Sequence, residues 1–124
     1  MGSRKLGIPE GREFKVSEIS EVKHDLKKIR VTNFETAYEL FKKALPQMYL
    51  EREWWKKHRI YLVSGLKCSC EVYIAKKLAV PGIKGNDHFR VVFRVVHEDL
   101  IIIEVFQKSQ KDIEDKKRIC DLCK

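Results

Sequence analysis

The residues of this sequence best suited to chemistry are basic, and they lie on or just after three predicted β-strands. The set comprises Lys76, Lys77, Arg90, Arg94, Lys108 and Lys111. Residues i and i+4 of a strand project from one face, and adjacent antiparallel strands would bring these side chains into one solvent-open neighbourhood. Grouped cations bind a polyanion and stabilise the added negative charge of a phosphorane-like transition state. Crowding among like charges also lowers the pKa of a lysine toward that of a general base.

Arg94 within this basic set and His88 beside it have alternative interpretations. Arg94 is expected to pair with Glu104 on the next strand, which leaves Arg90, at the loop end of its strand, as the stronger functional candidate. His88 either supplies an acid or a base or is an ordinary loop histidine. The sequence holds no glycine-rich phosphate loop, no Ser–His–Asp arrangement and no carboxylate cluster spaced for a hydrolytic metal site. We therefore expect no cofactor for catalysis.

All four cysteines fall into two short motifs, Cys68-Ser69-Cys70 and Cys120-Asp121-Leu122-Cys123. Two such pairs far apart in sequence are a usual source of the thiolates of a tetrahedral structural zinc site. Disulfides are rare in the cytosol, hyperthermophiles excepted. Zinc ligation by Cys68, Cys70, Cys120 and Cys123, disulfide bonding and unlinked thiols are all open alternatives. We expect the terminal helix to fold back so that its two cysteines approach the other pair.

Length and composition limit the class of protein. A chain of 124 residues, 44% hydrophobic and 35% charged, is expected to form one globular domain. Apolar runs such as Leu100–Ile103 are far shorter than the roughly 20 residues of a membrane span. Charges that recur from Arg4 to Glu13 argue against a signal peptide. We therefore expect a cytoplasmic protein with no membrane partner.

The charge balance favours an anionic partner. The chain has 26 Lys and Arg against 18 Asp and Glu, a formal net charge of +8. A domain this basic favours binding to nucleic acid or to an acidic protein, and a solvated lysine-rich surface is the alternative. Scarce Asn and Gln beside abundant Lys and Glu are typical of thermophilic proteins.

The first half of the chain is predicted to be mainly helical. Residues 1–26 are interpreted as an N-terminal extension, an edge strand or a short helix, ahead of a domain over residues 27–124. A short strand is predicted at 28–32, where apolar and basic residues alternate. A capping box at Thr32–Glu35 then opens a helix. The apolar stripe of this helix is Phe34, Ala37, Tyr38, Phe41, Ala44 and Leu45.

A second helix is predicted from Gln47 into the fifties, because Pro46 ends or kinks the first. Trp54 or Trp55 is expected in the core, since an aromatic side chain buries a large area. Stacking of these rings on nucleic-acid bases is the alternative.

The second half is predicted to be mainly sheet. Strands are expected at 71–80, 89–96 and 100–106, with a hairpin connection at 97–99. A charged helix begins at 109–112. The order β, α, α, β, β, β, α predicts an α+β fold in which a helical pair covers one face of a small, mostly antiparallel sheet.

The order of these segments resembles the RelE/ParE toxin superfamily. The resemblance is carried by Val72–Leu78, Phe89–Val95 and Ile101–Lys111, and the helix start at Thr32–Glu35 after a short strand also fits. The last of these segments is most similar to the HigB and phage-derived branch, in which a strand ends in Phe-x-Lys-x-x-Gln-Lys. The resemblance spans residues 27–119 and rests on the order and spacing of short motifs.

The resemblance implies a RelE-like fold, with a small antiparallel sheet packed against an N-terminal helical hairpin and a C-terminal helix. It also implies an mRNA interferase, which cuts mRNA on the ribosome without a metal ion and is masked by a cognate antitoxin. In this reaction the ribose 2′-hydroxyl attacks the neighbouring phosphate. Arg90 matches the family's arginine at the scissile phosphate. Lys76 or Lys77 matches a lysine on the preceding strand, and Lys108 or Lys111 matches the basic position after the last strand.

The sequence also departs from the family pattern. The loop at 81–88 is long, the N-terminal extension is unusual, and no tyrosine lies in the C-terminal segment, where some members have a catalytic one. His88 is a candidate for the missing acid or base. Activity as an endoribonuclease is therefore open, and two other functions stand beside it. One is a non-catalytic module on the same fold that binds nucleic acid or protein, and the other is a ParE-like inhibitor of a topoisomerase.

Overall fold

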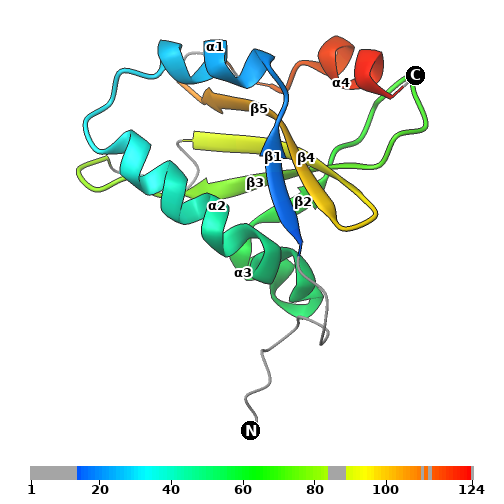
Figure 1. Ribbon diagram of the computed structural model, residues 1–124, viewed down its shortest axis with the longest axis horizontal. Helices are drawn as coiled ribbons and strands as arrows, with labels where there is room; N and C mark the ends of the chain where they lie inside the picture. The colour runs from blue at the N-terminus through cyan, green and yellow to red at the C-terminus, as the bar shows by residue number, and fades with distance from the viewer. Residues whose placement is uncertain (1–13, 84–88, 110, 112, 124) are drawn as a thin grey trace, which may run out of the picture.

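The computed structural model describes residues 14–83, 89–109, 111 and 113–123, apart from the side chains of Trp54 and Lys77. In chain order the elements are β1 (Lys15–Glu18), α1 (Glu21–Lys28), α2 (Phe34–Leu50), the 3₁₀ helix η1 (Arg52–Trp54), α3 (Trp55–His58), β2 (Ile60–Leu62), β3 (Val72–Leu78), β4 (Phe89–Val96), β5 (Asp99–Gln107) and α4 (Lys116–Leu122). Figure 1 shows the arrangement, which is the predicted α+β class. None of these helices is long and apolar enough to cross a membrane.

The strands form one five-stranded sheet in the order β1-β5-β4-β3-β2. Strands β2 to β5 pair antiparallel, and β1 runs parallel to β5 at the edge. The strand predicted at 89–96 is β4, the one at 100–106 lies within β5, and the one at 71–80 contains β3. The sheet that carries the basic residues therefore follows the prediction closely.

Helix α2 covers one face of the sheet. Its buried residues are Phe34, Ala37, Tyr38, Phe41 and Leu45, which confirms the predicted stripe except at Ala44, which is exposed. Pro46 neither ends the helix nor starts a new one, because α2 continues to Leu50. Partly buried Met48 and Tyr49 pack against the core beyond the proline, and this burial outweighs the loss of one helical hydrogen bond.

The N-terminal segment takes both of the forms that the sequence left open. Residues 15–18 form the edge strand β1, and residues 21–28 form α1, whose Val22 is fully buried in the core. The division of the chain at residue 26 stays a prediction. Beyond the end of β1, helix α1 continues along the edge of β5, where β5 has no neighbouring strand among the described residues.

The structure corrects two predictions just before α2. The strand expected at 28–32 is wrong, because this stretch ends α1 and connects it to α2. Its alternation arises because Ile29 and Val31 pack against the core without pairing in the sheet. The capping box at Thr32–Glu35 is also wrong. The N-cap of α2 is Asn33, which has a φ of 71° and makes no side-chain capping hydrogen bond.

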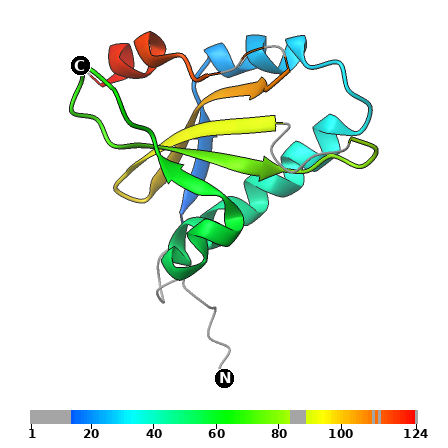
Figure 2. The same cartoon turned by 180° about the vertical axis from the view of Figure 1, so that it is seen from behind.

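The opposite face of the sheet carries a second, smaller apolar cluster. It consists of Val63, Val72, Ile74, Val92, Ile103, Phe106 and Ile119. In Figure 2, which shows the sheet from behind, the end of β3 passes in front of α2, and α4 lies beside one end of the sheet. Helix α4 begins at Lys116, later than the predicted 109–112, because Asp115 caps it by accepting a hydrogen bond from the Arg118 backbone amide at 3.0 Å.

Candidate nucleic-acid interface

A β-bulge in β3 sets both strand lysines opposite Arg90. The register of β3 against β4 shifts between Ala75 and Leu78, so that Lys76 and Lys77 oppose a single residue of β4. That residue is Arg90. Bulges of this kind re-aim side chains and are over-represented beside active sites. The sequence predicted that these residues lie on adjacent strands, but not the bulge that brings them opposite one another.

Phe106 on β5 and Lys111, in the segment after β5, extend this group. Arg90 is the cross-strand partner of Phe106, so the two side chains lie on the same face of the sheet. Nζ of Lys111 lies 5.7 Å from the centroid of the Phe106 ring. Lys108 is exposed just beyond the end of β5. Basic residues from β3 and from the segment just after β5 thus lie on either side of Arg90.

Tyr61 belongs to the same face, although sequence analysis did not propose it. Nζ of Lys76 lies 5.0 Å from the centroid of the Tyr61 ring, a cation–π distance. Tyr61 pairs with Ile74, a member of the second apolar cluster, and is 39% exposed. The signal in the sequence that could have pointed to Tyr61 was an aromatic residue in the middle of the short strand β2, a position that the structure shows to be exposed. An exposed aromatic ring beside a cation is a surface on which a nucleic-acid base can stack.

Arg90 is more deeply placed than the sequence suggested. Its exposed fraction is 9%, and β4 has neighbouring strands on both sides. The expectation of an exposed arginine is therefore wrong, because the central strand β4 is covered by its neighbours, and even Nε of Arg90 is buried. Of the other predicted site residues, Lys77 is placed by its backbone alone, and His88 lies outside the described residues.

The predicted ion pair between Arg94 and Glu104 is wrong. The register of β4 and β5 places Arg94 opposite Ile101, and its Nη1 donates to the carbonyl of Leu122 at 3.5 Å. A bulge in β5 places Glu104 opposite Val92 instead. Arg94 therefore contacts the last turn of α4 and is separate from the group around Arg90.

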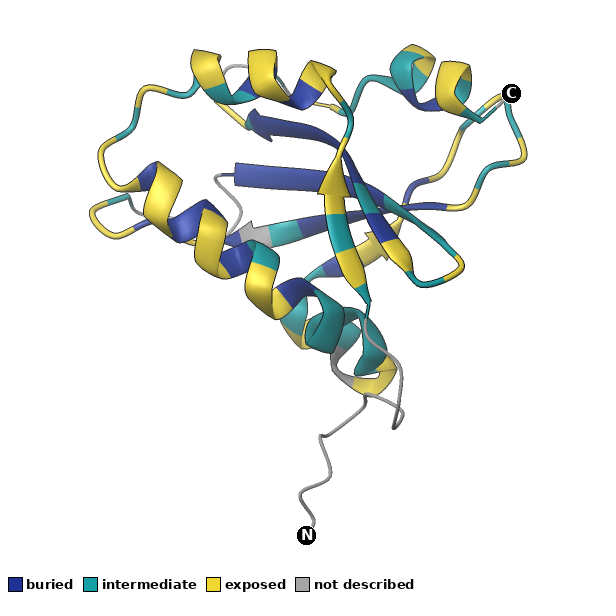
Figure 3. Cartoon of the chain, in the orientation of Figure 1, coloured by how far each residue is buried: buried dark blue, intermediate teal, exposed yellow. Residues whose placement is uncertain are grey.

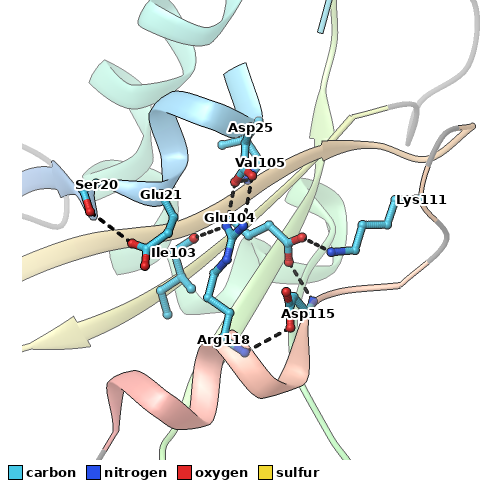
Figure 4. A network of polar contacts seen from close by, with 9 residues as sticks. All are labelled: Ser20, Glu21, Asp25, Ile103, Glu104, Val105, Lys111, Asp115 and Arg118. Atoms are coloured by element: carbon cyan, nitrogen blue, oxygen red, sulfur yellow. Dashed lines mark hydrogen bonds and ion pairs between the residues drawn. The ribbon is translucent and has the colours of Figure 1, made fainter. Parts of the chain in front are cut away.

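Glu104 instead orients Lys111 (Figure 4). The side chain of Glu104 is 2% exposed, and its carboxylate forms an ion pair with Nζ of Lys111. It also accepts a hydrogen bond at 2.7 Å from the backbone amide of Asp115, just before α4. A buried carboxylate requires such partners. The signal in the sequence was one acidic residue in an otherwise apolar strand.

The two cysteine pairs lie close together in the structure, as predicted, and they form two disulfides. Cys68 is bonded to Cys120, and Cys70 to Cys123, with Cα–Cα distances of 5.6 Å and 5.8 Å. The proposed zinc ligation is therefore not supported, because all four thiols are already paired. Among the described residues no group of three or more His, Cys, Asp or Glu is arranged to hold a metal ion. The predicted return of the terminal helix toward the first pair is confirmed.

The class of fold that these elements define is RelE-like. A solved structure described as the crystal structure of an archaeal RelE–RelB complex from Pyrococcus horikoshii OT3 matches the chain with a TM-score of 0.51 at 14% sequence identity. The match covers 78% of this chain and 97% of the other. No protein-family model and no curated protein matches the sequence. The likeness therefore defines the fold of this protein, and its activity has to be argued from the residues.

Proposed function

We propose that this protein is a RelE-like mRNA interferase toxin that cleaves RNA without a catalytic metal ion. The observation that carries the proposal is the β3 bulge, which sets Lys76 and Lys77 opposite Arg90 within a RelE-like fold. Cleavage by a 2′-hydroxyl needs cations held around one phosphate, and strands of a sheet supply fixed positions for them. The formal net charge of +8 suits an RNA substrate.

In the proposed reaction the ribose 2′-oxygen bonds to the neighbouring phosphorus, and the bond from phosphorus to the 5′-oxygen breaks. The products are a 2′,3′-cyclic phosphate and a 5′-hydroxyl. Lys76 or Lys77 accepts the proton of the 2′-hydroxyl, and Lys108 or His88 returns a proton to the leaving oxygen. Arg90 binds the phosphate, because its planar fork can hold two oxygens at once.

Two further residues support this site. Lys111 supplies a second positive charge beside the phosphate, and its ion pair with buried Glu104 holds it in place. Tyr61 offers its exposed ring to a base of the same RNA strand, since stacking on an aromatic ring tolerates any base.

The partners proposed for such a toxin are an antitoxin protein and mRNA on the ribosome. The similar archaeal structure is that of a RelE–RelB complex, which supports a protein partner of the antitoxin kind. The proposed place of action is the cytoplasm, where the mRNA is translated.

A non-catalytic RNA-binding module is the second candidate function. The observation that favours it is the burial of Arg90, whose 9% exposure restricts how closely a phosphate can approach. In that case the same cations and Tyr61 hold RNA without cutting it.

Substitution of Arg90 distinguishes the two functions. We expect Arg90→Lys, which keeps the charge but loses the fork, to reduce RNA cleavage about a hundredfold and to relieve growth arrest on induced expression. The matched control is Arg94→Lys, on the same strand, which should cleave at the wild-type rate. Circular dichroism of both variants tests whether the fold is intact. Cleavage by Arg90→Lys at the wild-type rate, or a wild-type protein that binds RNA without cutting it, would exclude the ribonuclease function.

A further inference from the structure

Helix α1 and the residues just after it present a strip of exposed cations that the candidate site does not use. The residues of this strip, here the α1 strip, are Lys23, Lys27, Lys28 and Arg30. In Figure 3 the outer side of α1 is coloured as exposed, and the buried positions face the sheet. His24 is exposed beside the strip.

The orientation of α1 is fixed by a buried carboxylate. Asp25, which is 6% exposed, accepts a hydrogen bond at 3.1 Å from the backbone amide of Val105 on the edge of β5. It also accepts two hydrogen bonds from Arg118 of α4, at 2.8 Å and 3.2 Å (Figure 4). With Val22 also buried, α1 cannot rotate about its axis, so the strip is held facing solvent.

Acidic residues of the described chain lie near the strip without pairing with it: Glu35 and Glu39 line a cavity together with Lys27 and Arg30. None of its four residues forms an ion pair with another described residue. Lys23 and Lys27 have the i, i+4 spacing at which like charges destabilise a helix. The helix dipole favours Lys27 and Lys28 in the last turn but disfavours Lys23 in the first. Helix stability therefore does not account for the strip.

The strip adjoins the candidate site. A cavity of about 280 Å³ lies between α1, β5 and the segment that leads into α4. Its lining includes Lys28 and Lys111 together with the acidic residues Asp25, Glu104 and Asp115. Lys28 is the last residue of α1, and Lys111 is the cation held by Glu104. One anionic chain can therefore contact the site and the strip in succession.

We propose that the α1 strip binds the phosphodiester backbone of single-stranded RNA next to the segment held at the candidate site. The proposal rests on the proposed function in so far as RNA is the substrate. RNA backbone suits the strip better than an acidic protein does. The exposed large apolar residues of the described chain are Leu40, Tyr61, Leu62, Ile113 and Leu122, none of them on α1. Protein interfaces instead have an apolar centre.

A binding experiment tests the strip apart from catalysis. The variant is Lys23→Gln/Lys27→Gln/Lys28→Gln, and its matched control, Lys15→Gln/Lys43→Gln/Lys56→Gln, removes as many exposed lysines from β1, α2 and α3. The probe is a fluorescent RNA oligonucleotide with 2′-O-methyl groups, which lacks the attacking hydroxyl. Anisotropy titrations over a range of salt concentrations give the affinity and its salt dependence.

We expect the strip variant to bind at least tenfold more weakly than the control. The slope of log affinity against log salt should fall by about 2, because three phosphate contacts at about 0.7 each are lost. Equal affinities and slopes for the strip variant and the control would overturn the proposal. Tight, strip-dependent binding of poly-glutamate by a protein that does not bind RNA would also overturn it.

The proposed ribonuclease function and the proposal for the α1 strip can be disproved independently of each other. If the wild-type protein cleaves no unmodified RNA but binds the methylated probe through the strip, the ribonuclease function falls and the strip proposal stands. If the wild-type protein cleaves RNA and the strip variant binds like the control, the strip proposal alone falls.

Discussion

Tyr38 joins α2 to the edge strand through its hydroxyl group. The hydroxyl donates a hydrogen bond of 2.5 Å to Oε2 of Glu18 on β1. Burial, this hydrogen bond and nearby carboxylates raise the pKa of Tyr38 above its ordinary value. A proton held more tightly in the folded than in the unfolded chain stabilises the fold up to about pH 10, the unfolded pKa, and the contribution is lost as the pH rises further.

Tyr38→Phe should therefore change how the free energy of unfolding depends on pH at alkaline pH. We expect it to lower the free energy of unfolding by about 1 kcal/mol at neutral pH, because one hydrogen bond is lost. Above about pH 10 the variant should lose stability less steeply than the wild type, because the raised pKa is gone. Urea unfolding at several pH values measures both effects. An unchanged alkaline slope would show that Tyr38 does not hold its proton in this way.

The buried pair of Asp25 and Arg118 offers a second test at the scale of residues. Arg118 donates to both carboxylate oxygens of Asp25 and, at 3.0 Å, to the carbonyl of Ile103. Arg118→Met would leave the carboxylate buried without its cation, so we expect a loss of about 3–5 kcal/mol in the free energy of unfolding. Asp25→Asn/Arg118→Met should recover part of it. A single variant within about 1 kcal/mol of the wild type would contradict this account.

At the scale of elements, two disulfides tie α4 to the segment before β3. They join residues 52 and 53 positions apart and so close nearly the same loop. The loop-entropy model gives about 4 kcal/mol for the first crosslink. The second adds much less, because the chain is already closed.

This geometry predicts non-additive effects of removing the crosslinks. We expect Cys70→Ser/Cys123→Ser alone to lower the free energy of unfolding far less than the loss of both disulfides, which should lower it by about 4 kcal/mol. Urea unfolding with and without a thiol reductant provides the measurement, and Cys68→Ser/Cys120→Ser is the reciprocal variant. Equal, additive losses would show that the two disulfides stabilise different parts of the fold.

The elements differ in how far the sequence predicts them. The apolar stripe of α2 follows from local periodicity, and β4 follows from an unbroken run of strand-forming residues whose first five positions are all buried. The bulges in β3 and β5 do not, because a register shift depends on the partner strand. The edge strand β1 was equally hard to specify, since its pairing with β5 joins residues distant in sequence.

At the scale of the whole molecule, the candidate site depends on contacts between strands. The sequence singled out Arg90 and the basic residues around it, because runs of strand-forming residues and the turn residues between them mark where the strands begin and end. It did not reveal that Arg90 is largely buried, which follows from the central position of β4 in the sheet. Tyr61 was not predicted as a site residue because its strand, β2, is only three residues long, which is too short for periodicity to define.

The two crosslinks also make a closed covalent ring of most of the sheet. Strands β3, β4 and β5 all lie between Cys70 and Cys120, and so do Lys76, Arg90 and Lys111. A protease that cuts one peptide bond within this ring cannot release a fragment, because the two pieces remain joined through sulfur. A nicked chain would therefore migrate as one molecule on a gel until a thiol separates the pieces.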